Sequence, residues 1–111
     1  MKVLILENGR LFQKILQDLL IELDCTVSCV RTCEEGLELI HNTDAETRYN
    51  LIIASQHIFD KSSKEFIQYC RSCDTPIILL TSEPNEQLMK NARTAGIKDI
   101  FPKTNLTYLK S

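Results

Sequence analysis

The stretch Asn50-Leu-Ile-Ile-Ala-Ser55 decides the fold of this chain. Its four central residues are apolar, and no polar residue alternates with them. A short apolar run between polar turns is typical of a strand buried on both faces, as in a parallel sheet. In open parallel sheets, ligands bind where the strands end at their carboxyl edge. The polar group that this strand brings to that edge is the uncharged hydroxyl of Ser55.

Length and composition indicate one ordinary globular domain spanning residues 1–111. The net charge is −2 and the basic residues are scattered, so neither nucleic acid nor an acidic membrane surface is indicated as a partner. No run approaches the roughly 18 apolar residues that span a bilayer. The chain has five cysteines, an odd number, and no secretory signal. These features predict reduced thiols and a cytoplasmic location.

Runs of apolar or β-branched residues predict five strands. They are Lys2–Leu6, Thr26–Arg31, Asn50–Ser55, Ile77–Leu80 and Lys98–Phe101. Helices are predicted between them. They are Leu11–Leu23, a helix opened by the capping box Thr32-x-x-Glu35, a helix opened by a second capping box Ser62-x-x-Glu65, and Asn85–Ala95 with Gly96 as its stop. Thr104–Ser111 has room for barely two helical turns.

The first of these helices has the clearest periodicity. Apolar residues recur in it at spacings of three and four, namely Leu11, Phe12, Ile15, Leu16, Leu19, Leu20 and Leu23. This pattern is typical of an amphipathic helix with one wide apolar face. We expect that face to belong to the core and not to a partner site.

The alternation of strands and helices predicts an α/β fold with helices on both faces of a parallel sheet. The expected architecture is a flavodoxin-like (βα)5 three-layer sandwich with strand order 2-1-3-4-5 and a last helix that is short or truncated. This order places the first strand beside the third. Polar residues at the carboxyl ends of the strands then meet at one edge, namely Glu7, Asn8, Ser55, Thr81 and Lys103.

These positions resemble the receiver domain of response regulators in two-component signalling, over nearly the whole chain. In that family an acidic pair ends the first strand and a phosphoacceptor aspartate ends the third. A Thr or Ser ends the fourth strand, and a lysine follows the fifth. The matching residues here are Glu7-Asn8, Ser55, Thr81 and Lys103. The run Ala95-Gly96-Ile97-Lys98-Asp99 is also similar to the family's segment before the last strand.

The chain also departs from the pattern of that family. Ser55 replaces the phosphoacceptor aspartate, and Asn8 replaces one residue of the acidic pair. Ile100 stands at the switch position, where the family often has an aromatic residue. Thr104 stands where the family usually has a proline, so the usual cis peptide bond is in doubt. The short C-terminus suggests a segment cut from a longer protein.

The chemistry of this pocket therefore differs from that of a working receiver. A serine hydroxyl cannot form an acyl phosphate, and a phosphate ester would need a base, for which His57 is a weak candidate. Mg²⁺ prefers carboxylate oxygens, and Glu7 is the one weak candidate ligand left. We expect no metal and no other cofactor. We expect Lys103 to pair with Glu7 instead, in a pocket fixed near one state.

Three functions remain open. The preferred one is a pseudo-receiver, not an enzyme, that binds a partner protein or regulates a fused output domain, with a homodimer as another arrangement. Its partner face would comprise Gln87, Lys90, Asn91 and Lys98. The second is a working receiver phosphorylated at Ser55 or Asp60, which would need Mg²⁺. The third is a small thiol-redox or other α/β enzyme that uses Cys70-x-x-Cys73.

Overall fold

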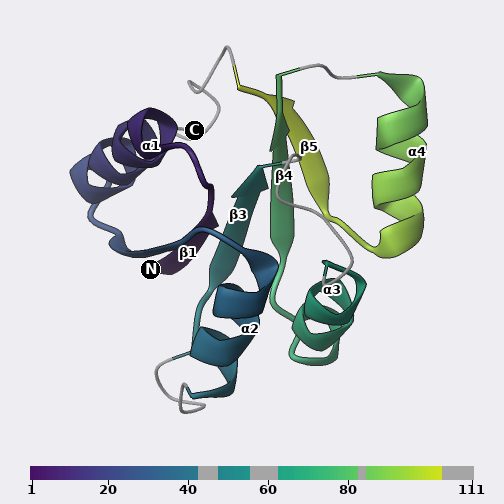
Figure 1. Ribbon diagram of the computed structural model, residues 1–111, viewed down its shortest axis with the longest axis horizontal. Helices are drawn as coiled ribbons and strands as arrows, with labels where there is room; N and C mark the ends of the chain where they lie inside the picture. Colours follow the sequence, from purple (N-terminus) through teal and green to yellow (C-terminus); the bar gives the residue numbers. More distant parts are fainter. Residues whose placement is uncertain (43–47, 56–62, 83–84, 104–111) are drawn as a thin grey trace.

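A computed structural model describes residues 1–42, 48–55, 63–82 and 85–103 of the chain. In this part of the chain, strands and helices alternate strictly (Figure 1). They are β1 (Lys2–Leu6), α1 (Arg10–Glu22), β2 (Thr26–Val30), α2 (Cys33–His41), β3 (Leu51–Ser55), α3 (Ser63–Ser72), β4 (Ile77–Thr81), α4 (Glu86–Ala95) and β5 (Asp99–Pro102). The predicted strands and the helices α1 and α4 are confirmed to within one residue at each end. The predicted cap Ser62 and the predicted last helix, Thr104–Ser111, lie outside the described residues.

The strands form one parallel sheet in the order β2-β1-β3-β4-β5, as predicted. β3 is the middle strand and pairs with β1 on one side and β4 on the other. Because all strands run the same way, Glu7, Ser55, Thr81 and Lys103 lie at one edge of the sheet, where β1, β3, β4 and β5 end.

The two faces of the sheet carry separate apolar clusters, which explains the absence of polar alternation in the strands. Val3 and Ile5 of β1 face α1, together with Ile53 of β3. Leu4 and Leu6 face the opposite way, into the larger cluster formed with α2, α3 and α4 (Figure 1). Successive residues of a strand point to opposite faces, so a strand covered on both faces has to be apolar throughout.

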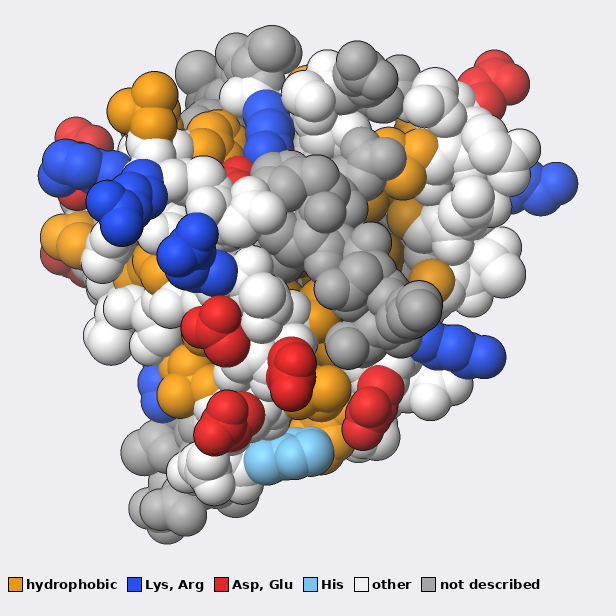
Figure 2. All heavy atoms as spheres, in the orientation of Figure 1, with side chains coloured by type: hydrophobic (Ala, Val, Ile, Leu, Met, Phe, Trp, Pro, Cys, Tyr) orange, Lys and Arg blue, Asp and Glu red, His pale blue; other side chains and the backbone are white. Residues whose placement is uncertain are grey.

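The apolar stripe of α1 is not entirely core, contrary to our expectation. Leu16 and Leu20 are buried, but Leu11 is 76% exposed and Ile15 is 45% exposed. The apolar arc of the helix is wider than the part that the sheet covers, so its outer residues face solvent. Figure 2 shows hydrophobic side chains at the surface near α1.

Local capping chemistry sets the ends of two helices. The Thr32 side chain accepts a hydrogen bond from the Glu35 N–H at 3.1 Å, which confirms Thr32 as the cap of α2. The Asn85 side chain accepts one from the Leu88 N–H at 2.8 Å at the start of α4. Gly96 ends α4 in the left-handed region with φ of 95°, a conformation that glycine adopts without a side-chain clash.

The surface carries charges of both signs. Basic side chains gather near α1 and acidic ones over α2, and apolar side chains are exposed among them (Figure 2). Within the described part of the chain, no helix combines the length and the apolar character that a membrane span requires.

Candidate functional site

The carboxyl edge of the sheet brings Glu7, Ser55 and Lys103 into direct contact. Glu7 follows β1, Ser55 ends β3, and Lys103 follows β5. The Ser55 Oγ donates a hydrogen bond to Oε1 of Glu7 at 2.7 Å. The Lys103 Nζ contacts the same oxygen at 2.9 Å. One carboxylate oxygen therefore holds both the hydroxyl at the end of β3 and the lysine after β5.

Hydrogen bonds to Gly9, Gln13 and Val30 hold the rest of Glu7. Its second oxygen, Oε2, accepts a hydrogen bond from the Gly9 N–H at 2.9 Å. Its backbone carbonyl accepts one from the Gln13 side chain, and its N–H donates to the Val30 carbonyl. Gly9 and Gln13 belong to the start of α1, so the first turn of that helix fixes the carboxylate in place.

These contacts determine the charge of Glu7. Glu7 is 1% exposed, and burial by itself disfavours the ionised form of a carboxyl group. The Gly9 N–H, Lys103 and Ser55 outweigh this burial and hold the pKa of Glu7 below its usual value. The carboxylate is thus an anion at neutral pH, paired with a cation and satisfied on both oxygens.

Lys103 is fixed by contacts beyond its ion pair. Its Nζ lies 4.5 Å from the centre of the Phe12 ring, within the range of a cation–π interaction. Its backbone N–H donates to the Thr81 carbonyl at 2.8 Å. The lysine therefore lies between the carboxylate of Glu7 and an aromatic ring of α1, tied by its backbone to the end of β4.

The remaining predicted pocket residues differ in burial. Thr81 is fully buried at the end of β4. Asn8 lies at the same edge after β1, but its side chain is exposed. Ile100 is partly buried against the larger apolar cluster and pairs with Leu79 in the sheet, whereas Thr81 pairs with Pro102. The switch position is thus offset along the sheet from the threonine, and its role stays a prediction.

The residues of the predicted partner face are all exposed. Gln87, Lys90 and Asn91 lie on α4, and Gln87 donates a side-chain hydrogen bond to Asn91 at 2.9 Å. Lys98 lies just before β5. Their exposure agrees with a surface that can be contacted, but binding through it stays a prediction.

The other candidate groups are dispersed or undescribed. Cys70 lies in the last turn of α3 and Cys73 directly follows the helix, close to the expected position. In the described part of the chain, no three His, Cys, Asp or Glu residues cluster as a metal site would require. His57 and Asp60 lie outside the described residues.

Sequence reasoning missed three contributors to the site. Gly9 supplies an N–H to the carboxylate, Gln13 holds its backbone, and Phe12 lies against Lys103. The periodicity had placed Phe12 simply in the core. The only signal for the others is their position, since residues that open a helix after the first strand lie at the carboxyl edge of the sheet.

Several solved structures of other proteins are similar to this architecture. A two-component response regulator from Clostridium difficile matches with a TM-score of 0.84 and 24% identity, over 99% of this chain and 89% of that chain. The chain has the fold of a response-regulator receiver domain. The chemotaxis protein CheY4 of Vibrio cholerae has a receiver fold similar to this chain, with a TM-score of 0.82 and 21% identity, over 98% of this chain and 92% of that chain.

A third similar structure is the phosphorylated cyanobacterial phytochrome response regulator RcpA. It shares 19% identity at a TM-score of 0.78, over 97% of this chain and 84% of that chain. No family model and no curated protein sequence matches. The receiver fold predicted from the sequence is therefore confirmed, and the identities establish the fold alone.

Proposed function

We propose that this protein is a signal-transduction module of the response-regulator type whose pocket does not accept phosphate. It acts by binding a partner protein or by regulating an attached output domain. The observation that supports this proposal most directly is the hydrogen bond from Ser55 Oγ to Glu7 Oε1, at the end of the middle strand, β3. An acyl phosphate forms on a carboxylate, whereas the residue at this place is a serine, whose hydroxyl donates a hydrogen bond to Glu7.

The ion pair in the pocket supports the same proposal. Clustered carboxylates repel one another unless a cation lies among them. Here Lys103 supplies a cation at 2.9 Å from Glu7, and the neighbouring Ser55 is neutral. We infer that the pocket binds Mg²⁺ weakly or not at all, because the one carboxylate among its described residues already has Lys103 as its counter-charge. The charge that a metal would balance in a full acidic pocket is balanced by the protein itself.

One observation favours phosphorylation of Ser55 as a second candidate. A hydroxyl beside a carboxylate at 2.7 Å resembles a nucleophile with its base. Two facts weigh against it. The pKa of Glu7 lies below its usual value, which makes it a weak base, and Ser55 is 1% exposed. Phosphorylation at Asp60 is the other form of this alternative.

The thiol-enzyme alternative has less support. Burial, with smaller contributions from Cys73 and Cys33, raises the pKa of Cys70 to about 12. A reactive cysteine needs a stabilised thiolate, and here the neutral thiol is favoured instead.

We propose the exposed residues Gln87, Lys90, Asn91 and Lys98 as the surface that contacts the partner.

An NMR titration tests the proposal. Amide signals of ¹⁵N-labelled protein are followed with Mg²⁺ and then with beryllofluoride, which mimics a phosphoryl group on a carboxylate. We expect the signals of Glu7, Ser55, Thr81 and Lys103 to stay in place. The Ser55→Asp variant is the matched control because it restores an acceptor carboxylate. Saturating shifts in the wild-type protein would overturn the proposal, and mass analysis after treatment with acetyl phosphate would then distinguish Ser55 from Asp60.

A further inference from the structure

A groove of about 480 Å³ lies between α3 and α4, which cover the same face of the sheet (Figure 1). Its apolar lining residues are the least exposed ones, since Ile67 is buried and Ala95 is half-buried. The exposed side chains that line it are polar, namely Lys64, Gln68 and Arg71 on α3 and Lys90, Asn91 and Thr94 on α4. The groove is separate from the Glu7 pocket and shares Lys90 and Asn91 with the proposed partner face.

The groove gathers positive charge. Lys64, Arg71 and Lys90 are scattered along the sequence, but they line the same space, and no Asp or Glu is among the described residues that line it. In the described part of the chain, none of these three side chains forms a salt bridge or a hydrogen bond. A hollow lined by charges of one sign attracts ligands of the other sign, because their field is concentrated there. The groove therefore suits an anion.

Packing against α4 positions one of the three cations. A Cβ added to Gly96 would lie 2.6 Å from Cδ of Arg71 and 3.1 Å from its Cζ, so the Arg71 side chain reaches across from α3 to the end of α4. This packing places the guanidinium at one end of the groove. A guanidinium presents five donors in a planar fork, which matches the oxygens of a phosphate group.

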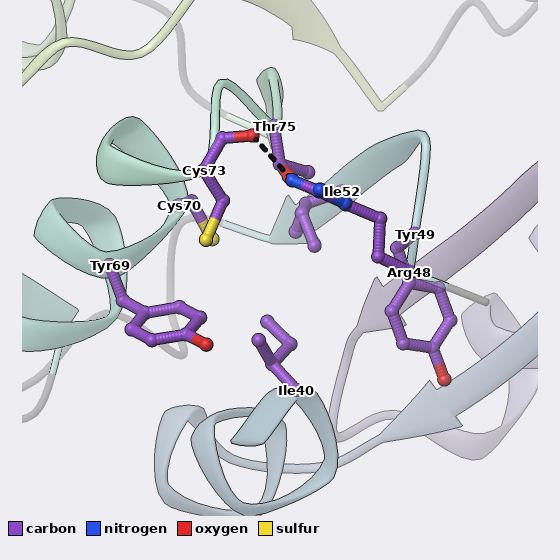
Figure 3. A pocket seen from close by; sticks show the side chains of 8 residues that line it. All are labelled: Ile40, Arg48, Tyr49, Ile52, Tyr69, Cys70, Cys73 and Thr75. Carbon is purple, nitrogen blue, oxygen red and sulfur yellow. Dashed lines mark hydrogen bonds between the residues drawn. The ribbon is translucent and has the colours of Figure 1, made fainter. Parts of the chain in front are cut away.

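A cavity at the amino edge of the sheet lacks this gathering of charge (Figure 3). Arg48 is the one cation among the described residues that line it, and its Nη1 already donates to the Cys73 carbonyl at 3.3 Å. Apolar and aromatic side chains such as Ile52 and Tyr69 surround the space (Figure 3). A ligand with several negative charges is thus matched by the groove between α3 and α4 and not by this cavity.

The spacing of the cations narrows the ligand further. Lys64 and Arg71 are seven residues apart on α3, about 10 Å along the helix axis, and Lys90 lies on the α4 side of the groove. A single phosphate ion is too short to contact both ends of this stretch, whereas a chain of phosphates spreads its charge along it. The volume is within the range of small-molecule sites, roughly 300–1,000 Å³.

We propose that the groove between α3 and α4 binds a small polyphosphate, a ligand with about three phosphate groups in a chain. The phosphates pair with Lys64, Lys90 and Arg71. The amide of Gln68 donates a further hydrogen bond to the same chain of oxygens. This assignment does not depend on the chemistry of the Glu7 pocket, and it adds a ligand site next to the proposed partner face.

An NMR titration with inorganic tripolyphosphate, without divalent metal and at constant ionic strength, tests this site. Amide shifts of the ¹⁵N-labelled protein are followed at Ile67, Gln68, Asn91 and Thr94. We expect saturable shifts there, and binding of orthophosphate that is weaker by about tenfold or more, because it forms fewer charge-assisted hydrogen bonds. Glu7 and Ser55 report on the receiver pocket in the same spectra, and their signals are expected to stay in place.

Single-charge variants distinguish a defined site from a general attraction to basic protein. Arg71→Gln and Lys90→Gln each remove one charge from the groove and are expected to weaken tripolyphosphate binding about tenfold. Arg93→Gln removes one charge from an exposed position of α4 outside the lining, so it is the matched control and should leave the affinity unchanged. Because Lys90 is exposed, its replacement tests recognition even where that of Arg71 disturbs the end of α4.

The proposal would be overturned by the absence of saturable shifts at tens of millimolar tripolyphosphate, or by shifts confined to Glu7 and Ser55. Undiminished binding by Arg71→Gln and Lys90→Gln, or an equal loss in Arg93→Gln, would overturn it as well. Hexaglutamate serves as the carboxylate probe at the same ionic strength. Binding of this peptide as tight as that of tripolyphosphate would assign the groove to an acidic protein segment and not to a polyphosphate.

Discussion

The Nζ of Lys103 lies 2.9 Å from Oε1 of Glu7, a residue that is 1% exposed. The same oxygen accepts the hydroxyl of Ser55 at 2.7 Å. The charge of the carboxylate is therefore compensated within the chain. Stability, its pH dependence and the response to metal should therefore all depend on this compensation.

Removing the cation should destabilise the protein. In Lys103→Met, Glu7 keeps its bonds from Gly9 and Ser55 but loses its counter-charge. Breaking a buried ion pair costs about 3–5 kcal/mol, and the 18% exposure of the Lys103 side chain lowers our expectation to about 1–3 kcal/mol. Urea unfolding monitored by circular dichroism measures this loss.

The exposed ion pair between Lys14 and Asp18 provides the control. Its side chains are 75% and 62% exposed, so Lys14→Met should cost no more than about 0.5 kcal/mol. Similar losses in the two variants would mean that burial adds nothing to the Lys103 pair.

Glu7 should make stability depend on pH below neutrality. Its pKa is lower in the folded chain than the ordinary value of 4.5, so the folded state favours the ionised form. Its contribution is then fully present above pH 4.5 and is lost as the pH falls through the folded pKa. Urea unfolding of wild type and Glu7→Gln between about pH 7 and pH 3 measures this contribution. The advantage of the wild type should be constant at higher pH and shrink on acidification; an advantage that grows would contradict the prediction.

Restoring the carboxylate at the end of β3 should create a metal-dependent protein. Ser55→Asp places a second buried carboxylate beside Glu7, and like charges in one site repel. In EDTA we expect a loss of about 1–2 kcal/mol, seen as a Tm lower by several degrees, with partial recovery in Mg²⁺. Differential scanning calorimetry with and without Mg²⁺ measures both effects. Ser55→Asn has nearly the same size without the charge, so an equal Mg²⁺ response in the two variants would refute this account.

A side chain at Gly96 should destabilise the fold. Its φ of 95° is strained for other residues, and an added Cβ would lie 2.6 Å from Cδ of Arg71. Gly96→Ala is expected to cost about 1–3 kcal/mol in thermal or urea unfolding. Gly9→Ala is the matched control, because its φ is −89° and an added Cβ would meet Glu7 Oε2 at an ordinary 3.6 Å. That change should stay within about 0.5 kcal/mol, and equal losses would contradict the argument.

Much of the fold could be predicted because its signals are local. The five strands are short apolar runs, and capping residues such as Thr32 and Asn85 mark where helices begin. The meeting of Glu7, Ser55 and Lys103 follows from a rule of topology, since parallel strands end at a common edge. The sequence alone was sufficient to place these three side chains together.

The other features of the structure depend on tertiary packing, which cannot be read from the periodicity of the sequence. Helical spacing identifies the apolar face of α1 but not how much of it the sheet covers, so the exposure of Leu11 was not foreseen. A pocket lined by Ile40, Tyr49 and Tyr69, among others, is assembled from separate segments of the chain, and no spacing links them. The hydrogen bond from the Gly9 N–H to the Glu7 carboxylate depends on the path of the turn between β1 and α1.

The order of strands also bears on how this chain folds as it leaves the ribosome. β1 lies between β2 and β3, so these three strands, which are consecutive along the chain, are also neighbours in the sheet. Lys103, however, is 96 residues away from Glu7. During translation the N-terminal strands can associate while the carboxylate still lacks its counter-ion. We therefore expect closure of the Glu7 edge to be a late step of folding, completed only when β5 joins the sheet.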